Sequence, residues 1–451
     1  MMQPFRYHVL VCTQQKSENV PCCAANGASD ILSALHEQLA KENLADEVIV
    51  SSTGCLGACE HGPVMIVYPD AAWYGAVELT DIPEIVRSHL RDGRVVERLM
   101  LTDKSALRTE ILDHRKEYRA MVEARDRSGT LPEELDSQIR AYWPSRALLT
   151  ALELDMFTAV GTGASAAQVA NNIGTDPRAT EMLLNVLVSL GTLRKQNEIF
   201  CNTPNSARYF CAGSPDNAQP GLLHMVHLWD SWSKLTECVR SGGPASLPRR
   251  ERDEASTRDF IAAMDRNSRQ RAQQIVRVVG TDFTRMLDLG GGSGAYSIAF
   301  AKGNPNAEFE ILDVAAVVPL TQQYVQRAGV ESRIHTRAGD MLTDDYGEGY
   351  DLVLLSAIAH MFSPEENRAL LARIYRALAP NGRLVLQDFI LNADKTSPKF
   401  AAWFSLNMLV NTRGGASYSE PEYREWLMAA GFRETRRVPL PGPSDLIIAT
   451  K

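Results

Sequence analysis

Five of the eight cysteines fall within the first sixty residues: Cys12, Cys22, Cys23, Cys55 and Cys59. Four thiolates drawn from two loops suit an iron-sulfur cluster, which takes four cysteine ligands. Zinc also takes four sulfurs, but its ligand pairs usually stand about two to four residues apart, and Cys12 and Cys23 are farther apart than that. Structural cysteines without a ligand are the third interpretation, and the clustering argues against it.

A second candidate site is the glycine-rich segment RMLDLGGGSG, which contains Asp288, Gly290, Gly292 and Gly294. The segment joins an apolar run to a helix-like run, so the glycines would let the backbone approach a ligand closely at a helix start, where polar or anionic groups bind well. The spacing of Gly290, Gly292 and Ala295 also satisfies the dinucleotide fingerprint, with Asp313 as the ribose acid. Spacing alone therefore leaves a nicotinamide cofactor open.

His360 follows the apolar run YDLVLLSAI, at the mouth of a predicted sheet. Folds of this type bind their ligands at that edge. Histidine can accept a proton near neutral pH, so His360 is the predicted general base for a hydroxyl nucleophile. The alternative is a structural histidine in a strand-to-helix turn.

The segments VPCCAANGASD and TGCLGACEHGPVMIVYPDAAWYGAV resemble the thioredoxin-like 2Fe-2S ferredoxins over roughly residues 5–100. This resemblance implies a 2Fe-2S cluster held by four cysteines: Cys12, Cys23, Cys55 and Cys59. Cys23 is preferred to Cys22 because Ala24 and Gly27 follow it in the family pattern. The first loop is shorter than in the family and its cysteine is doubled, so Cys22 stays the alternative ligand.

The glycine segment, with an acid two residues before its first glycine, resembles motif I of class I methyltransferases that bind S-adenosylmethionine (SAM). The resemblance implies that Asp288 and the glycines face the amino-acid end of SAM and that Asp313 faces the ribose hydroxyls. Asp340 and Met341, in AGDML, would contact the adenine. These assignments favour SAM over a nicotinamide.

Residues 140–451 resemble more broadly the O-methyltransferases that include plant phenolic and bacterial polyketide enzymes. RALLTALELDMFTAVG and FCNTPNSARYF match the winged-helix dimerisation region of that family, which implies a homodimer. The family's catalytic His-Asp-Trp segment aligns with His360-Met361-Phe362, so the histidine is kept and the other two residues are not. A DNA-binding winged helix is the competing interpretation, but its second helix, near 177–190, offers Arg178 as its one base.

The resemblance also implies residues that assist the base and bind the acceptor. Glu422 takes the place of the family's second acidic residue, with Glu420 as the nearby alternative. A carboxylate bonded to the imidazole would fix its tautomer and raise its basicity. A helix-start glutamate that complements the helix dipole is the structural alternative for Glu422. Asn407 and Met408, in MLVNTRGG, are predicted to line the acceptor pocket.

The elements that must position these residues predict an α/β multidomain protein. We expect a thioredoxin-like domain at 1–101, a helical linker at 102–127, a winged-helix dimerisation domain at 128–265 and a Rossmann-like methyltransferase domain at 266–451. In the last of these, apolar runs alternate with helix-length segments, which indicates a largely parallel sheet covered on both faces.

Composition excludes several other classes of protein. The 451 residues are 45% hydrophobic and 23% charged with a net charge of -8, which fits neither a disordered chain nor a membrane protein. A nucleic-acid partner is not expected, because basic residues do not cluster. The opening MMQPFRYHVLVCTQQ makes a poor secretory signal, so we expect a cytoplasmic location with reduced thiols.

Two functions follow from these features. The first is a SAM-dependent methyltransferase that acts on a small-molecule hydroxyl, with sulfur or nitrogen as other acceptors, and whose ferredoxin-like domain regulates the enzyme or docks a redox partner protein. The second is a redox-responsive ligand-binding or electron-transfer protein with a non-catalytic methyltransferase fold, which the loss of Asp and Trp after His360 motivates.

Overall fold

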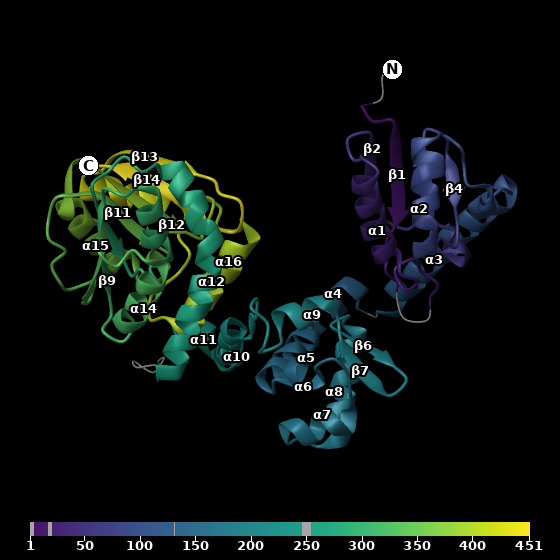
Figure 1. The fold of residues 1–451 in the computed structure, drawn as a ribbon, viewed down its shortest axis with the longest axis horizontal. Coiled ribbons are helices and arrows are strands. Elements are labelled where there is room, and N and C mark those ends of the chain that lie inside the picture. Colours follow the sequence, from purple (N-terminus) through teal and green to yellow (C-terminus); the bar gives the residue numbers. More distant parts are fainter. Residues whose placement is uncertain (1–3, 17–19, 130, 246–253) are drawn as a thin grey trace. The chain divides into compact units, whose positions relative to one another are not determined.

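The computed structural model describes residues 4–16, 20–129, 131–245 and 254–451. The chain forms two compact units, residues 1–140 and residues 141–451 (Figure 1). The helix α12 (Glu254–Val279) runs through the predicted boundary at residue 265. The finer division into four parts stays a prediction.

The first unit contains a four-stranded sheet in the order β2-β1-β3-β4. The strands are β1 (Tyr7–Cys12), β2 (Val48–Thr53), β3 (Met65–Tyr68) and β4 (Ala72–Tyr74), with β1 parallel to β2 and antiparallel to β3. The helices of this unit include α1 (Ala28–Lys41) and α2 (Ile82–Glu84), which continues as a π-helical segment, Ile85–Arg91. Val9 and Val11 of β1 both point into the core, where Leu35 of α1 also packs, because alternate residues of a strand face the same side of the sheet.

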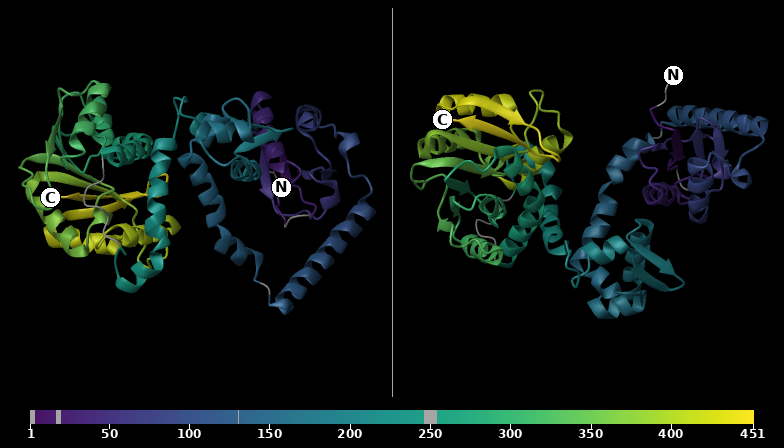
Figure 2. Two further views of the ribbon diagram at one scale, coloured as in Figure 1. Left: turned by 90° about the horizontal axis from the view of Figure 1, so that it is seen from below. Right: turned by 45° about the horizontal axis from the view of Figure 1, so that its top comes forward.

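The helix α3 (Lys104–Ser128) lies where the sequence predicts a helical linker. Asp103 caps its start by accepting hydrogen bonds from the backbone NH groups of Ser105 and Ala106, and Gly129 ends it in the left-handed region at φ 69°. Figure 2 shows that its first turns lie against the N-terminal domain and that the rest projects from it. The helix α4 (Glu133–Arg140) follows.

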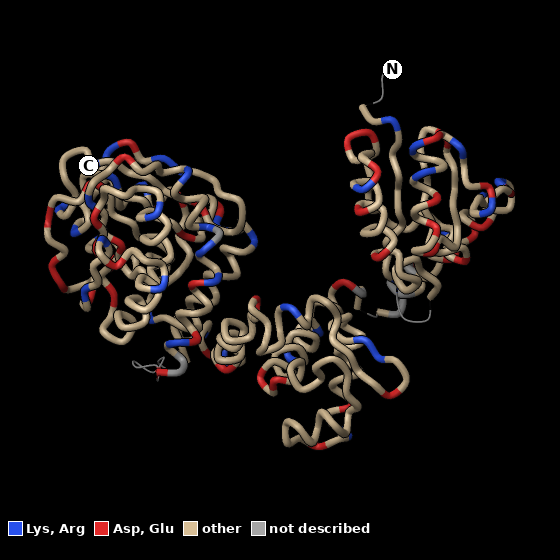
Figure 3. The backbone as a smooth tube through the Cα atoms, in the orientation of Figure 1, with Lys and Arg blue, Asp and Glu red and all other residues tan. Residues whose placement is uncertain are grey.

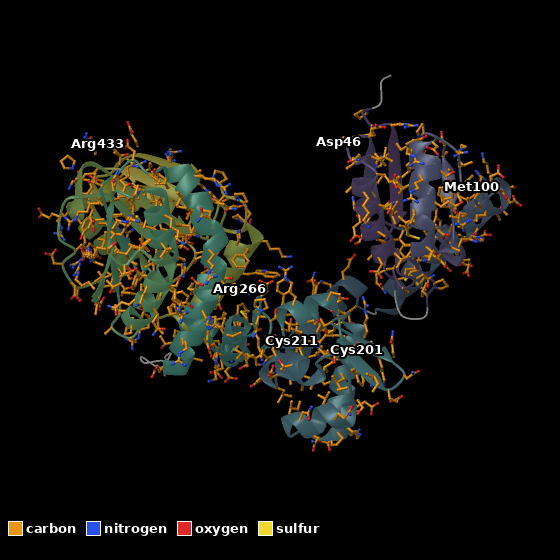
Figure 4. The ribbon with its side chains drawn as sticks, viewed as in Figure 1. Asp46, Met100, Cys201, Cys211, Arg266 and Arg433 are labelled. Carbon is orange, nitrogen blue, oxygen red and sulfur yellow. The ribbon has the colours of Figure 1, made fainter. Side chains whose placement is uncertain are left out.

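The second unit begins with helices and a small three-stranded sheet. The helices are α5 (Tyr142–Glu153), α6 (Met156–Val160), α7 (Ala166–Ile173), α8 (Pro177–Ser189), α9 (Pro204–Tyr209), α10 (Gln219–Ser233) and α11 (Leu235–Ser241). The sheet has the order β5-β7-β6, from β5 (Ala164–Ser165), β6 (Leu193–Gln196) and β7 (Ile199–Asn202). Figure 4 places Cys201 and Cys211 in this part of the chain, apart in sequence from the N-terminal cysteine group.

A seven-stranded sheet with the order β10-β9-β8-β11-β12-β14-β13 forms the remainder of this unit. Five strands are parallel: β8 (Arg285–Leu289), β9 (Glu308–Asp313), β10 (Ile334–Ala338), β11 (Tyr350–Ser356) and β12 (Leu378–Asp388). The antiparallel pair β13 (Arg433–Val438) and β14 (Asp445–Thr450) completes the sheet. The helices are α13 (Ala295–Gly303), α14 (Val318–Ala328), α15 (Pro364–Ala377), α16 (Lys399–Asn411) and α17 (Glu420–Ala430).

The strand order of this sheet reverses beside β8, because β9 lies on one side of it and β11 on the other. Ligands of doubly wound folds bind at such a point, beyond the carboxyl ends of the strands. Buried side chains cover the sheet in two hydrophobic clusters, as expected for a parallel sheet with helices on both faces. The Rossmann-like part of the predicted fold is confirmed.

Basic and acidic residues are interspersed along the backbone of the second unit (Figure 3). Among the described residues, no helix is both long enough and apolar enough to span a membrane. The cytoplasmic location stays a prediction.

Candidate active site and candidate cluster site

The glycine segment forms the turn between β8 and α13. Gly290, Gly292 and Gly294 all have positive φ angles of 58° to 76°, which favour glycine. A Cβ atom on Gly290 would overlap the side chain of Ile358 and come within 3.1 Å of Met341 Cε. Bare backbone therefore lines this turn, and the N-terminus of α13 opens onto it, as a site for a polar ligand requires.

Asp288 is buried next to this turn. Its Oδ2 accepts a hydrogen bond of 2.7 Å from the Ser297 hydroxyl, whereas its buried Oδ1 has no partner among the described residues. Burial raises the pKa of Asp288 to about 7, although the Ser297 hydroxyl opposes this shift. An unpartnered buried carboxylate oxygen is costly unless a ligand donates to it, so this oxygen fits the ammonium group of SAM.

Asp313 ends β9 on the other side of the turn. Its Oδ2 accepts from the backbone NH of Gly292 at 2.8 Å, and its Oδ1 accepts from that of Val314 at 2.7 Å. Burial raises the pKa of Asp313, while these two donors lower it. The carboxylate therefore lies against the glycine turn, where the sequence predicts a ribose contact.

Asp340 and Met341 follow β10, the next strand of the sheet. Asp340 Oδ1 accepts from the backbone NH of Leu342 at 2.8 Å and shapes a turn. Met341 lies close to Gly290, since its Cε would be 3.1 Å from a Cβ atom at that position. The structure therefore brings the predicted adenine-contact segment to the glycine turn.

His360 lies in the short turn Ala359–Met361 after β11, and its side chain is only 8% exposed. Its Nδ1 is 2.6 Å from Oδ1 of Asp388, the last residue of β12, and its backbone NH donates to Oδ2 of Asp388 at 3.0 Å. A carboxylate on Nδ1 places the imidazole proton there and leaves Nε2 as the basic nitrogen. This is the tautomer that a general base needs.

Two aromatic rings contact the imidazole, and a third packs against them. The Phe404 ring meets it edge to face at 4.7 Å between centroids, and the Phe389 ring lies 5.9 Å away. Phe400 packs against both phenylalanines. Sequence reasoning missed these residues, although the two phenylalanines of the helix stand four residues apart and so share one helix face.

The two predicted acceptor residues lie on α16 with Phe404. Met408 stands four residues after Phe404 and is buried, so both belong to one face of the helix. Asn407 accepts a hydrogen bond of 2.9 Å from Trp232 Nε1 of α10. Asn407 therefore ties α10 to α16 beside the aromatic rings, which the sequence did not indicate.

Glu422 does not bond to the imidazole, contrary to our prediction. Its Oε2 accepts from the backbone NH of Ser419 at 2.8 Å in a capping box at the start of α17, and its Oε1 accepts from Lys395 at 2.7 Å. Burial alone would raise the pKa of Glu422, but these donors hold it below its ordinary value. Asp388 takes the place predicted for Glu422. The alternative, Glu420, pairs with Arg424 instead.

The N-terminal cysteines form two pairs. The Cys23 thiol donates to Cys12, which lowers the pKa of Cys12 to about 6 and raises that of Cys23. The sulfurs of Cys55 and Cys59 are 3.4 Å apart. No group of three or more His, Cys, Asp or Glu side chains with metal-binding geometry is found in the described ranges. Two cysteine pairs nevertheless suit a centre of two irons, since each iron takes two cysteines.

Backbone contacts hold the two cysteine loops together. A Cβ atom on Gly62 would lie 3.1 Å from Cys23 Sγ, so the second loop passes directly over that sulfur. Asn26 Nδ2 also donates to the carbonyl of Gly62 at 3.2 Å. Lys16 donates to Cys59 Sγ at 2.9 Å, and a cation beside these sulfurs favours thiolates. The donor set therefore fits the cluster.

Comparison with known proteins shows the family of the chain. The chain is similar to the 3-hydroxy-5-methyl-1-naphthoate 3-O-methyltransferase of Streptomyces sahachiroi, with 32% sequence identity over 320 residues. The match covers 68% of this chain and 92% of that enzyme. The chain belongs to the O-methyltransferase family. Residues 232–433 of this methyltransferase match the model of the O-methyltransferase domain, and residues 137–211 match that of the O-methyltransferase dimerisation domain.

Two further comparisons cover a similar share of the chain. The methyltransferase is 28% identical to the tetracenomycin polyketide synthesis 8-O-methyl transferase of Streptomyces glaucescens, over 69% of this chain and 94% of the relative. The solved structure of human N-acetylserotonin methyltransferase in complex with SAM is 26% identical, with a TM-score of 0.63 over 70% of this chain and 96% of that one. SAM is accordingly the methyl donor.

Residues 2–89 match the model of the thioredoxin-like 2Fe-2S ferredoxins. The methyltransferase therefore carries a ferredoxin-like domain with a 2Fe-2S cluster at its N-terminal end, and its dimerisation domain supports a homodimer. The predicted families, fold class and cofactors are confirmed, whereas the assignment of individual residues to the two cofactors stays a proposal.

Proposed function

We propose that this methyltransferase transfers the methyl group of SAM to a hydroxyl of a small aromatic acceptor, with His360 as the general base. The single observation that carries the proposal is the buried pair of His360 and Asp388, which leaves Nε2 as the proton acceptor beside aromatic rings. The two Streptomyces relatives are both named as O-methyltransferases, one of a hydroxynaphthoate.

The residues divide the work of the reaction. SAM supplies a methyl carbon on a positively charged sulfur, so a nucleophile can displace the thioether in line. Asp288 would hold the amino-acid end of SAM, Asp313 the ribose, and Asp340 and Met341 the adenine. His360 would take the proton of the acceptor hydroxyl as the oxygen–methyl bond forms, and Asp388 would stabilise the resulting imidazolium.

The aromatic rings select the acceptor. Phe389, Phe400 and Phe404 offer ring faces and edges on which a planar aromatic molecule can stack. Met408 would add an adaptable apolar contact on the same helix face. The imidazole side chain is only 8% exposed, which would keep its basic nitrogen available to the acceptor hydroxyl.

The ferredoxin-like domain would serve regulation or the docking of a redox partner protein. Methyl displacement moves no net electron, so the cluster is not needed for the chemistry. We assign its iron ligands as Cys12, Cys23, Cys55 and Cys59; the assignment of Cys23 is supported by its place in one buried cluster with Cys12, a cluster that does not include Cys22. One methylation assay with the cluster oxidised and then reduced tests regulation, and equal rates would exclude it.

Radiolabel transfer from SAM tests the proposed acceptor class. The purified enzyme is given naphthols, phenols, aromatic amines and thiols in parallel. We expect label in the hydroxyl compounds and, for His360→Ala, a loss of transfer without a loss of SAM binding. Label confined to amines or thiols would overturn the acceptor assignment, and unchanged transfer by His360→Ala would remove the base.

A further inference from the structure

Tyr423 lies one hydrogen bond beyond the pair of His360 and Asp388. It belongs to α17 and is fully buried, with its ring packed against Tyr418 and Trp426. Its hydroxyl donates to Asp388 Oδ2 at 3.3 Å. A buried tyrosine hydroxyl normally finds a partner, and here that partner is the carboxylate that orients the predicted base.

Each oxygen of the Asp388 carboxylate has two donors. Oδ1 accepts from His360 Nδ1 at 2.6 Å and from the backbone NH of Phe389 at 2.8 Å. Oδ2 accepts from the backbone NH of His360 at 3.0 Å and from Tyr423. The backbone donors are fixed by the fold, so Tyr423 is the donor that a side-chain change can remove without touching the imidazole.

We propose that Tyr423 is a positioning residue of the methyl-transfer reaction, which holds the Asp388 carboxylate in place and thereby sets the orientation and basicity of His360. The proposal rests on the proposed function. Each donor to a carboxylate disperses its negative charge. Loss of the Tyr423 hydroxyl would therefore strengthen the electrostatic attraction between the Asp388 carboxylate and the His360 imidazolium.

Other titratable groups near Tyr423 do not replace its hydroxyl. Tyr418 donates to the carbonyl of Phe362, and Glu422 is held by Ser419 and Lys395. On the helix α15, which packs against α17, Arg368 pairs with Glu425. Arg437 of β13 pairs with Asp445 and Glu420. Burial and the Asp388 charge raise the pKa of Tyr423 well above its ordinary value, so its hydroxyl stays a donor at working pH.

The test compares Tyr423→Phe with the wild-type enzyme in a pH–rate profile. Loss of one hydrogen bond predicts a fall of kcat of roughly two- to tenfold with unchanged KM for SAM. The acid limb of the profile should move to higher pH, because the imidazolium is stabilised. A merely structural hydroxyl would not move that limb. The control is Tyr375→Phe, whose ring packs on Phe432 outside this network and whose profile should match the wild type.

The outcomes separate this proposal from the proposed function. If His360→Ala loses activity and Tyr423→Phe keeps both kcat and the acid limb, the positioning role is overturned while the base stands. If His360→Ala keeps its activity, the proposed base itself fails. A Tyr423→Phe profile displaced to higher pH, with the Tyr375→Phe profile unchanged, supports the positioning role.

A separate observation concerns the helix α3, which touches the loop that carries Cys55 and Cys59. Between residues 104 and 121 its side chains are exposed except at four positions: Leu107, Glu110, Ile111 and His114. These positions form one face of the helix, because they are three or four residues apart. The face therefore marks where α3 is held.

All four side chains of this face contact the cysteine region. Leu107 packs in a cluster with Cys12, Cys23 and Ala58. Ile111 Cγ2 lies 3.0 Å from the Cβ position of Gly57, a residue whose φ of 92° also requires glycine. His114 Nδ1 is 2.6 Å from the carbonyl of Gly57, and Glu110 pairs with His61 at 3.2 Å. The conformation of the loop therefore decides whether α3 can dock.

We infer that the 2Fe-2S site and α3 form one conformational device. Iron ligation by Cys55 and Cys59 keeps the loop in the conformation that contacts α3. Loss of the cluster releases the first turns of the helix. Few buried contacts hold α3, so its docking belongs to the low-stability part of the fold. The change would reach the segment that precedes the dimerisation domain in the sequence.

Hydrogen exchange of the full-length protein, with the cluster present and after its anaerobic removal by a chelator, tests this device. Peptides from residues 104–117 should exchange at least about tenfold faster without the cluster. A decrease of about 1.4 kcal/mol in the free energy of local opening raises the exchange rate tenfold. Peptides of β8 and β9 should not change. Equal exchange of 104–117 in both forms would overturn the inference.

Two variants sharpen this test. Ile111→Ala should free the helix even with the cluster loaded, so its 104–117 peptides exchange fast while its visible absorption is retained. The control Leu112→Ala changes the neighbouring exposed residue and should behave as the wild type. Slow exchange in loaded Ile111→Ala would show that the loop does not hold the helix. A wild-type protein that takes up no iron would instead contradict the ferredoxin assignment.

Discussion

Asp288, Asp313 and Asp388 lie on strands of one sheet, whereas Cys23, Cys55 and Cys59 of the first unit lie on or beside loops. The strand residues are fixed by ladder hydrogen bonds and by a buried core. The cysteines are held by turns, by Lys16 and by the contact of α3. The difference teaches that the SAM site is fixed by the strands of a sheet, whereas the cluster site is fixed by contacts between loops.

The largest expected effect is the loss of the 2Fe-2S cluster from its cysteine site. Cys59→Ser removes one of four ligands and should abolish the visible absorption of the cluster, because serine is a poor iron ligand at such a site. Cys201→Ser, from the dimerisation part, is the matched control and should keep the full spectrum. A coloured Cys59→Ser protein would mean that another residue, such as Cys22, completes the cluster.

His360→Ala tests the strand-built site through its chemistry. A general base contributes about two to four decades of rate, so kcat should fall by that factor. SAM affinity, measured by calorimetry, should stay the same, because His360 follows a different strand from the glycine turn. A fall in SAM affinity equal to the fall in kcat would show that His360 acts in binding.

Asp288→Asn should weaken SAM binding roughly ten- to a hundredfold, because a hydrogen bond to a charged group is lost. The pH dependence gives a sharper sign. With a pKa of about 7, the free carboxyl is partly protonated at neutral pH, and binding of an ammonium group favours its ionised form. SAM affinity should therefore fall as the pH drops from 8 to 6 in the wild type and stay flat in the variant. A flat wild-type curve would contradict the assignment.

The smallest effect is expected for Glu422→Gln. This residue caps α17 and pairs with Lys395, so its loss should cost about 1 kcal/mol or less in the free energy of unfolding. The methylation rate should stay within about twofold, since the hydrogen bonds of a cap act on stability. A loss of rate comparable with that of His360→Ala would restore Glu422 to the catalytic group.

The sequence predicts Asp288, Asp313 and His360 better than it predicts the residues that contact His360. Asp288 and Asp313 are predicted from their spacing to the glycines of the methyltransferase-like motif, and His360 from its place after the apolar run YDLVLLSAI. Asp388 was missed although it also ends an apolar run, RLVLQD, because Glu422 matched a family position and drew the assignment. Tyr423 and Phe404 could not be found, since their contacts depend on how α16 and α17 pack on the sheet.

In the N-terminal unit, the helices and strands agree with the hydrophobic pattern of the sequence. The residues of β1 alternate in burial, α1 buries Ile31, Leu35 and Leu39 at helical spacing, and β3 and β4 form an antiparallel hairpin. The contact of α3 with the cysteine loop was not predicted, because Leu107 and Ile111 read equally well as one side of a solvated linker. A four-residue face on a charged helix carries too little apolar surface to reveal its partner.

Calorimetric titration with SAM, on one preparation before and after removal of the iron, tests most directly whether the donor site is complete without the cluster. The account predicts the same dissociation constant, within about twofold, and the same one-to-one stoichiometry per chain in both forms. Loss of SAM binding together with the iron would contradict it, because the SAM site would then depend on the cluster site.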